Sequence, residues 1–195
     1  MTTTVSNISS LINKANAGVM GDIFYLAAGT YDHTSRDAIN KAGVIVQALN
    51  PGKAIIKGAP IDITGQGVEF SGFDLQYSTT EQSVVNLKAL GIKLIKNIIH
   101  FVNRINTRQD WIISRANDCI IDENQIFNKV GMGNPILVGS GADIVTGTKI
   151  RNNYIHDHSG GSGNGAETIR LGSSETAKAV FHTEIAGNRL ENCST

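Results

Sequence analysis

The sequence predicts an all-β fold, a right-handed parallel β-helix (a solenoid) with a short N-terminal capping helix. Three observations support this prediction. Short apolar runs recur with Asn at one fixed position, an amphipathic helix precedes them, and the composition favours turns. The 195 residues include 21 glycines and 3 prolines, and only 6% of them are aromatic. Abundant turns and small apolar side chains suit stacked short strands better than a helical bundle.

The length and charge of the chain limit the classes of protein that it can represent. We treat residues 1–195 as a single β-helix domain, with the cap at 1–18 and the rungs at 19–195. Because 17 basic residues balance 17 acidic ones, we expect neither a nucleic-acid partner nor a polybasic membrane surface. No apolar run approaches the roughly 20 residues of a membrane span. The N-terminus lacks the pattern of a signal peptide, so the localisation stays open.

The first segment contains the one good helix candidate. Ser6 or Asn7 can cap it, and Gly18 would end it. Four apolar residues share one face of this helix: Ile8, Leu11, Ile12 and Ala15. Such a helix would cover the apolar interior of the first rung, which a solenoid must shield from water.

Short strands follow the helix, and then a repeat begins. The first expected strands lie within Asp22–Ala27, Gly43–Leu49, Ala54–Lys57 and Ile61–Thr64. Each copy of the repeat has an apolar residue, two variable residues, usually Asn, one variable residue, and Ile or Leu. The five copies are Phe70–Leu75, Leu94–Ile99, Ile121–Ile126, Ile150–Ile155 and Ile185–Leu190.

The repeat indicates an internal ladder of asparagines. Asn97, Asn124, Asn153 and Asn188 occupy its fourth position, where the first copy has Phe73. We expect the flanking apolar residues to point inward, and each Asn to sit at a bend, where it tolerates a left-handed backbone. Its amide would then bond the Asn of the next rung. The intervals between fourth positions are 24, 27, 29 and 35 residues, as expected if surface loops lengthen along the coil.

A second set of apolar runs recurs before each later copy and predicts a second parallel sheet. These runs are Val84–Leu87, Trp111–Ser114, Ile136–Val138 and Thr168–Leu171. A leucine-rich repeat would have closer, more regular spacing and several leucines in each copy, and the sequence does not have them.

The polar candidates gather between His156 and Gly172. His156 and His158 could bind a metal from one strand face, but no third ligand has suitable spacing, so a wet turn is the simpler interpretation. Around Asn164 the glycines would let a ligand approach the backbone, with Glu167 and Arg170 projecting from the strand that follows. An Asn or Glu oxygen suits calcium, and an Arg fork suits a carboxylate. The alternative is that this loop merely turns the chain.

Two cysteines, Cys119 and Cys193, lie far apart in the sequence. Two residues do not make a disulfide framework. We expect them to be buried or half-buried free thiols.

Three stretches resemble polysaccharide lyase family 6, the alginate lyase and chondroitinase B family. They are Tyr25–Tyr31, Ala48–Gly52 and, most specifically, Gly163–Gly172. The resemblance implies a right-handed parallel β-helix that cleaves acidic polysaccharides, such as alginate, by β-elimination at a uronic acid. In this family calcium neutralises the uronate carboxylate, a Lys acts as base and an Arg as acid. The resemblance places Asn164 on a calcium ligand and Arg170, with Glu167 nearby, in the substrate groove.

The same resemblance implies no catalytic residue in this chain. The family's other calcium ligands, its Lys and its Arg would follow Thr195. We therefore expect a lyase completed at the C-terminal end by further rungs, by another chain or by a second copy of this chain. A secreted or periplasmic location would follow. The alternatives are a non-catalytic polysaccharide-binding or phage-fibre-like β-helix and an ice-binding or structural solenoid, although the scattered Thr residues do not favour ice binding.

Overall fold

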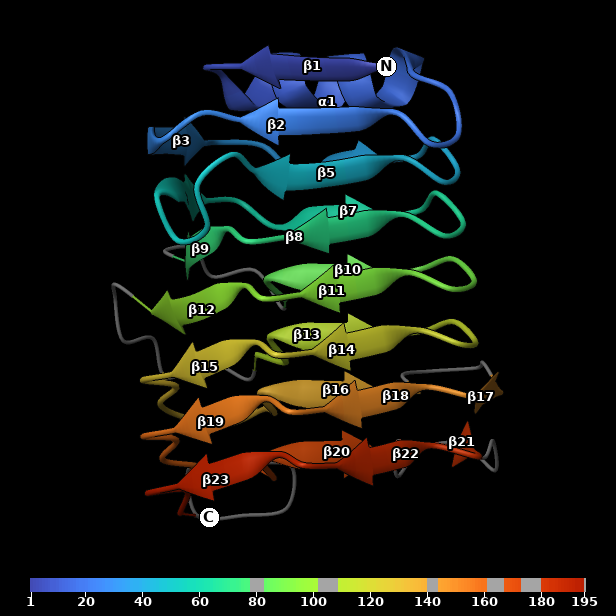
Figure 1. The fold of residues 1–195 in the computed structure, drawn as a ribbon. Coiled ribbons are helices and arrows are strands. Elements are labelled where there is room, and N and C mark those ends of the chain that lie inside the picture. The colour runs from blue at the N-terminus through green and yellow to red at the C-terminus, as the bar shows by residue number, and fades with distance from the viewer. Residues whose placement is uncertain (78–82, 102–108, 140–143, 161–166, 173–179, 195) are drawn as a thin grey trace.

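The computed structural model is a parallel β-helix in which successive rungs stack along one axis (Figure 1). It describes residues 1–77, 83–101, 109–139, 144–160, 167–172 and 180–194. In Figure 1 the front strands run right to left and the strands behind them return left to right. The chain descends from the N-terminus as it does so. This winding is right-handed, which confirms the predicted fold class.

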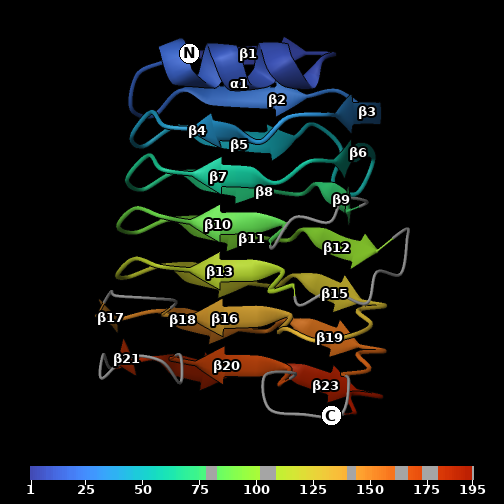
Figure 2. The same cartoon turned by 180° about the vertical axis from the view of Figure 1, so that it is seen from behind.

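Each full rung contributes one strand to each of three parallel sheets, which we call A, B and C (Figure 2). Sheet A contains β1 (Thr2–Val5), β2 (Ile23–Leu26), β5 (Ile45–Ala48), β8 (Glu69–Ser71), β11 (Lys93–Ile95), β14 (Ile120–Asp122), β18 (Lys149–Arg151) and β22 (Glu184–Ala186). Sheet B contains β3 (Gly29–His33), β6 (Ala54–Gly58), β9 (Asp74–Tyr77), β12 (Ile98–Phe101), β15 (Gln125–Phe127), β19 (Tyr154–His156) and β23 (Arg189–Glu191). Sheet C contains β4 (Asp37–Ile39), β7 (Ile61–Ile63), β10 (Val85–Leu87), β13 (Ile112–Ser114), β16 (Ile136–Val138) and β20 (Ile169–Leu171). A separate pair, β17 (Val145–Thr146) and β21 (Val180–Phe181), joins two connections between sheets C and A.

The capping helix is present as predicted. Helix α1 (Ile8–Ala17) begins after Asn7, whose side chain accepts a hydrogen bond from the Ser10 N–H at 3.0 Å. It ends at Gly18, and its four predicted apolar residues are buried. The sequence analysis did not predict β1, which pairs in parallel with β2 and extends sheet A beyond the first rung. Its Thr-rich sequence has a high strand propensity, so the N-terminal segment combines a helix and a strand.

The asparagine ladder is confirmed, and each amide has several partners. The Oδ1 of each ladder Asn accepts from the backbone N–H at the same position one rung earlier, at 2.9–3.0 Å, beginning at Phe73. The same Oδ1 accepts from the Nδ2 of the preceding ladder Asn, at 2.9–3.2 Å. The Nδ2 groups also donate to carbonyls of the preceding rung, at 2.8–3.1 Å. The ladder therefore bonds side chain to backbone as well as amide to amide.

One detail of the predicted bend is wrong: the left-handed residue precedes the ladder Asn. Positive φ angles occur at Lys96 (58°), Glu123 (54°) and Asn152 (54°), and glycines at 72 and 187 complete the series. The connection between sheets A and B has only two residues from β8 onward. The first of them bends the chain in the left-handed conformation. The second, the Asn, keeps a common backbone and points its amide into the ladder.

The apolar residues on both sides of the ladder stack inside the coil, as predicted. They are at most 3% exposed from the first to the fourth copy, which comprises Phe70, Leu75, Leu94, Ile99, Ile121, Ile126, Ile150 and Ile155. In the fifth copy Ile185 and Leu190 are 48% and 51% exposed. Within the described residues, no helix is long and apolar enough to cross a membrane.

Candidate functional site

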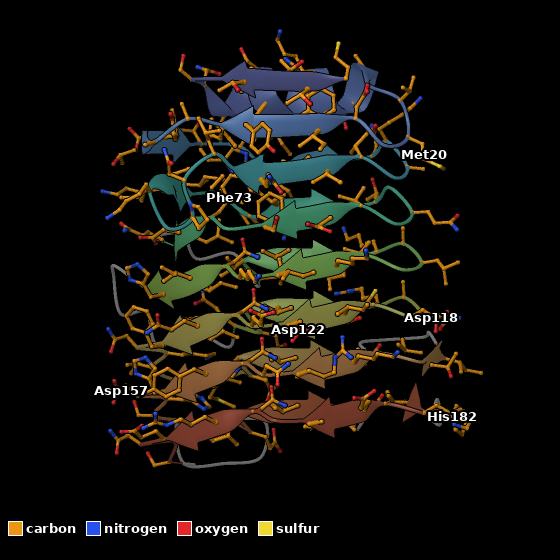
Figure 3. All side chains as sticks on the ribbon, viewed as in Figure 1. Met20, Phe73, Asp118, Asp122, Asp157 and His182 are labelled. Carbon is orange, nitrogen blue, oxygen red and sulfur yellow. The ribbon has the colours of Figure 1, made fainter. Side chains whose placement is uncertain are left out.

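The corner between sheets B and C differs from the ladder corner because the chain makes longer connections there. After β15, β19 and β23 the chain turns at a residue with positive φ: Asn128 (60°), Asp157 (52°) and Asn192 (51°). Asp157 marks this turn at the outer edge of sheet B in Figure 3. The segments beyond the turns stack through parallel bridges from Val130 to Ser159 and from Ser159 to Ser194. Sequence reasoning missed this second turn, although an Asn or Asp recurs four residues after three of the ladder asparagines.

Arg170 and Glu167 lie where this corner enters sheet C. Arg170 is the central residue of β20, next to Leu137 of β16. Its Nε donates to the Gly172 carbonyl at 3.1 Å, and its Nη1 lies 3.7 Å from Glu167 Oε2. The Arg170 side chain is 13% exposed, and that of Glu167 is 41% exposed. The structure thus brings together two of the three predicted residues. The hydrogen bond to the Gly172 carbonyl holds the Nε edge of the Arg170 guanidinium.

The third predicted residue, Asn164, lies outside the described residues. The two candidate histidines do not share a face, because the left-handed turn at Asp157 separates them. His156 lies on the outer face of sheet B, and its Nδ1 is 2.8 Å from Asp157 Oδ2. His158 is buried, and its Nδ1 is 3.3 Å from Thr168 Oγ1. The possibility that they bind a metal from one strand face is therefore not supported, since a regular strand does not extend from one to the other, and a turn at the end of β19 lies between them.

A buried lysine beside His158 was not anticipated from the sequence. Lys129 is 1% exposed, and its Nζ donates to the carbonyls of Gly131 (3.3 Å) and Met132 (3.1 Å). The Nζ also lies 5.9 Å from the ring centroid of Trp111. Burial lowers the pKa of Lys129 to about 8, although the Asp110 carboxylate opposes this shift. No periodic pattern in the sequence distinguishes this lysine from a surface lysine.

The outer face of sheet B carries a stack of rings. His100, Phe127 and His156 occupy matching positions on β12, β15 and β19, with centroids 4.8 and 4.9 Å apart and nearly parallel planes. The Asp74 carboxylate lies 2.9 Å from His100 Nε2, and Gln125 Nε2 lies 3.1 Å from His156 Nε2. Each ring covers the face of its neighbour, so a ligand cannot stack on the ring faces that lie between His100, Phe127 and His156.

Both cysteines are free thiols, as predicted. Cys119 is buried and Cys193 is partly buried. Burial raises the pKa of the Cys119 thiol above its usual value, which makes this residue a poor nucleophile at neutral pH.

Comparison with known families identifies the chain. The sequence profile described as Chondroitinase B matches residues 4–195. The chain belongs to the chondroitinase B family. Comparison with curated protein sequences found no match. The family assignment agrees with the resemblance found in Tyr25–Tyr31, Ala48–Gly52 and Gly163–Gly172.

Several solved structures share the β-helix of this chondroitinase B family member. One is a mannuronic acid specific polysaccharide family 6 lyase from human gut microbiota (TM-score 0.87, 21% identity, covering 99% of this chain and 49% of the other). Another is the polysaccharide lyase Pedsa3628 of this family from Pseudopedobacter saltans (TM-score 0.82, 20% identity, covering 96% and 46%). A third is an alginate lyase of this family in complex with a trisaccharide (TM-score 0.78, 15% identity, covering 98% and 48%). At these identities the likeness shows a polysaccharide-lyase-like fold.

The chain spans about half the length of these three structures, and 28% of the alginate lyase AlyGC. Among the described residues, no group of three or more His, Cys, Asp or Glu side chains could hold a metal ion. Glu167 instead faces Arg170.

Proposed function

We propose that this chain forms part of the substrate groove of a polysaccharide lyase that acts on an acidic polysaccharide such as alginate. The observation that carries the proposal is the pair formed by Arg170 of β20 and Glu167 just before this strand, in a chain of the chondroitinase B family. An Arg fork bonds a carboxylate through two parallel N–H donors, and every uronate residue of alginate carries a carboxylate.

The geometry of Arg170 supports this role. Gly172 and Glu167 engage Nε and Nη1. Glu167 Oε2 makes no hydrogen bond to the described residues, and it lies beyond hydrogen-bonding distance of the guanidinium. The two side chains are therefore paired by charge but not locked together. A uronate carboxylate can compete for the guanidinium, and Glu167 can then accept a hydrogen bond from a sugar hydroxyl.

Calcium dependence is a further part of the proposal, and Asn164 is its one candidate ligand in this chain. The remaining ligands, the base and the acid would come from outside the described residues. In the proposed reaction a base removes the C5 proton of the uronate. The C4–O bond then breaks with its electron pair leaving on oxygen, and a C4–C5 double bond forms. The acid protonates the departing oxygen, which completes the elimination.

A second candidate function is polysaccharide binding without cleavage. It is favoured by the absence of any metal-ligating group of three among the described residues. In this case Arg170 would still bind a uronate, but no unsaturated product would form.

The experiment that tests both candidates mixes alginate with the 195-residue chain and, in parallel, with the full-length gene product, each with calcium or with a chelator. Calorimetry measures binding, and ultraviolet absorbance detects the unsaturated uronate. Product from the full-length protein supports the lyase, and binding by both proteins without product supports the second candidate. If neither alginate nor another polyuronate binds, both candidates are wrong.

Arg170→Ala tests the site within this experiment. We expect it to weaken binding about ten- to a hundredfold, the range for a lost charge-assisted hydrogen bond. Arg170→Lys should recover only part of this loss, because Lys lacks the fork. Arg189→Ala is the matched control, since Arg189 is on sheet B and pairs with Glu191. Equal effects at both positions would show nonspecific attraction instead of a site at Arg170.

A further inference from the structure

At the corner that leads to the Glu167–Arg170 pair, three chemically distinct side chains occupy equivalent positions on successive rungs. Lys129, His158 and Cys193 each precede a residue of the bridged series Val130, Ser159 and Ser194. Backbone bonds hold these segments in register: the Ser159 N–H donates to the Lys129 carbonyl, and the Ser194 N–H donates to the His158 carbonyl, both at 2.9 Å. His158 therefore sits between a lysine on one rung and a cysteine on the next.

His158 contacts the residue that leads into β20. Its Nδ1 lies 3.3 Å from the hydroxyl of Thr168, which follows Glu167 directly and lies two residues before Arg170. The Thr168 carbonyl also accepts from the Ile136 N–H at 3.3 Å, so this residue is held to β16 by its backbone. The imidazole supplies the side-chain part of the same anchorage. Among the described side chains of the series Lys129, His158 and Cys193, the His158 ring makes the contact with the segment that carries the candidate site.

The other ring nitrogen of His158 has no hydrogen-bond partner among the described residues, although it is buried. A neutral imidazole tolerates this arrangement better than an imidazolium, which has two N–H donors and a charge to satisfy. Burial and, to a smaller extent, the nearby Lys129 ammonium lower the pKa of His158 to about 4. At neutral pH the ring is therefore uncharged.

The groups around His158 explain why it is sensitive to acid. Lys129 lies on the rung before it and carries the nearby positive charge, and the Asp110 carboxylate interacts with that charge. Cys193 lies on the rung after it, and Thr168 with Glu167 lies across the corner. The adjacent Asp157 faces outward and bonds His156 and Asn192. No carboxylate is hydrogen-bonded to the His158 ring within the described residues.

We propose that His158, stacked between Lys129 and Cys193, is a positioning residue that holds Thr168 and thereby orients the Glu167–Arg170 pair toward a substrate carboxylate. This inference rests on the proposed function for its substrate, but the positioning itself can be tested without substrate. Protonation of His158 gives both ring nitrogens an N–H, although the buried Nε2 has no partner among the described residues, and it places a second positive charge beside Lys129. The contact with Thr168 is then weakened, and the pair at the start of β20 loses its support.

Two substitutions separate the ring nitrogens of His158. His158→Asn keeps a polar atom near the Nδ1 position and cannot be protonated, whereas His158→Gln places its amide near Nε2 and leaves Thr168 without its partner. We expect His158→Gln to weaken alginate binding about three- to tenfold at neutral pH, and His158→Asn to retain it. Wild-type affinity should fall as the pH approaches 4, and this fall should be reduced in His158→Asn. Equal binding by the two variants at neutral pH would overturn the proposal.

A nuclear magnetic resonance titration without polysaccharide distinguishes a failure of the positioning role from a failure of the proposed function. The Arg170 Nε–H and Thr168 amide signals should shift together with the His158 ring in the wild type and remain flat in His158→Asn. His156→Asn, two residues away on the outer face of sheet B, is the matched control and should keep the wild-type response. If the Arg170 and Thr168 signals do not shift when His158 is protonated, the positioning role is wrong, whether or not the chain binds a polysaccharide.

Discussion

The two corners of the coil that flank sheet B follow different rules. At the ladder corner, each turn from β8 onward has two residues, a left-handed one and then a residue whose N–H or amide joins the ladder. At the corner between sheets B and C, the connections lengthen to 128–135 and 157–168, and they bury Lys129 and His158. The comparison indicates that the uniform corner maintains the fold, while the irregular corner is free to carry a site.

Removing one amide from the ladder should have the largest effect. In Asn124→Ala, the two hydrogen bonds that Asn124 Oδ1 accepts from Asn97 are lost, and so are the two that Asn124 Nδ2 donates. The buried backbone N–H of Asn97 is then left without a partner. We expect the free energy of unfolding to fall by about 3 kcal/mol or more, measured by urea denaturation. Asn188→Ala is the control, because water can replace the amide of this half-buried residue, and it should cost about 1 kcal/mol. Equal losses at the two positions would contradict the ladder's role inside the coil.

Acid should destabilise the fold through the corner between sheets B and C, where His158 is buried. The pKa of His158 is lowered from 6.5 to about 4, so between these values the unfolded chain binds more protons than the folded one. The stability that the neutral His158 ring contributes is therefore fully present above about pH 6.5, and it is lost as the pH falls toward 4. The difference amounts to about 3 kcal/mol.

This loss is checked by urea unfolding of the wild type and of His158→Asn across the same pH range. The variant should lack most of the acid-dependent loss, whereas His156→Asn should keep it. If wild type and His158→Asn lose the same stability on acidification, the depressed pKa of His158 is wrong. Lys129, whose pKa falls from 10.5 to about 8, should add a gain in stability as the pH rises between these values.

The smallest expected effect concerns the left-handed residue of the ladder corner. Lys96 has a φ of 58°, and its side chain forms only an exposed pair with Glu123 at 3.6 Å. Lys96→Gly should stabilise the fold by about 0.5 kcal/mol, because glycine adopts this conformation without a steric penalty but gains freedom in the unfolded chain. Lys96→Ala keeps the backbone strain and should be nearly neutral, since the exposed ion pair contributes little. Thermal unfolding compares them, and a gain for Ala equal to that for Gly would exclude the backbone explanation.

The ladder corner could be predicted from the sequence because its spacing is short and its chemistry repeats. Asn97, Asn124, Asn153 and Asn188 with their apolar neighbours were enough to predict the coil, the core and the strands that precede each copy. The left-handed position was assigned to the Asn instead of the residue before it, because both can adopt that conformation and the pattern does not distinguish them.

The site was only partly predictable. Glu167 and Arg170 were identified from a glycine-rich loop and a family resemblance. Lys129 and His158 were not recognised as a buried pair, because burial at the B–C corner depends on stacking between rungs 29 residues apart. A polar side chain that follows a turn residue ordinarily lies in solvent. The signal that could have revealed the stack was the Asn or Asp at positions 128, 157 and 192.

The two-residue turn also affects how this chain can change during evolution. Successive ladder positions are separated by 24, 27, 29 and 35 residues, yet each rung returns to the same register. A segment inserted at a distant corner therefore disturbs nothing beyond its own rung, because the next amide restores the alignment. New loops, and new specificities with them, can be acquired without any compensating change elsewhere in the coil.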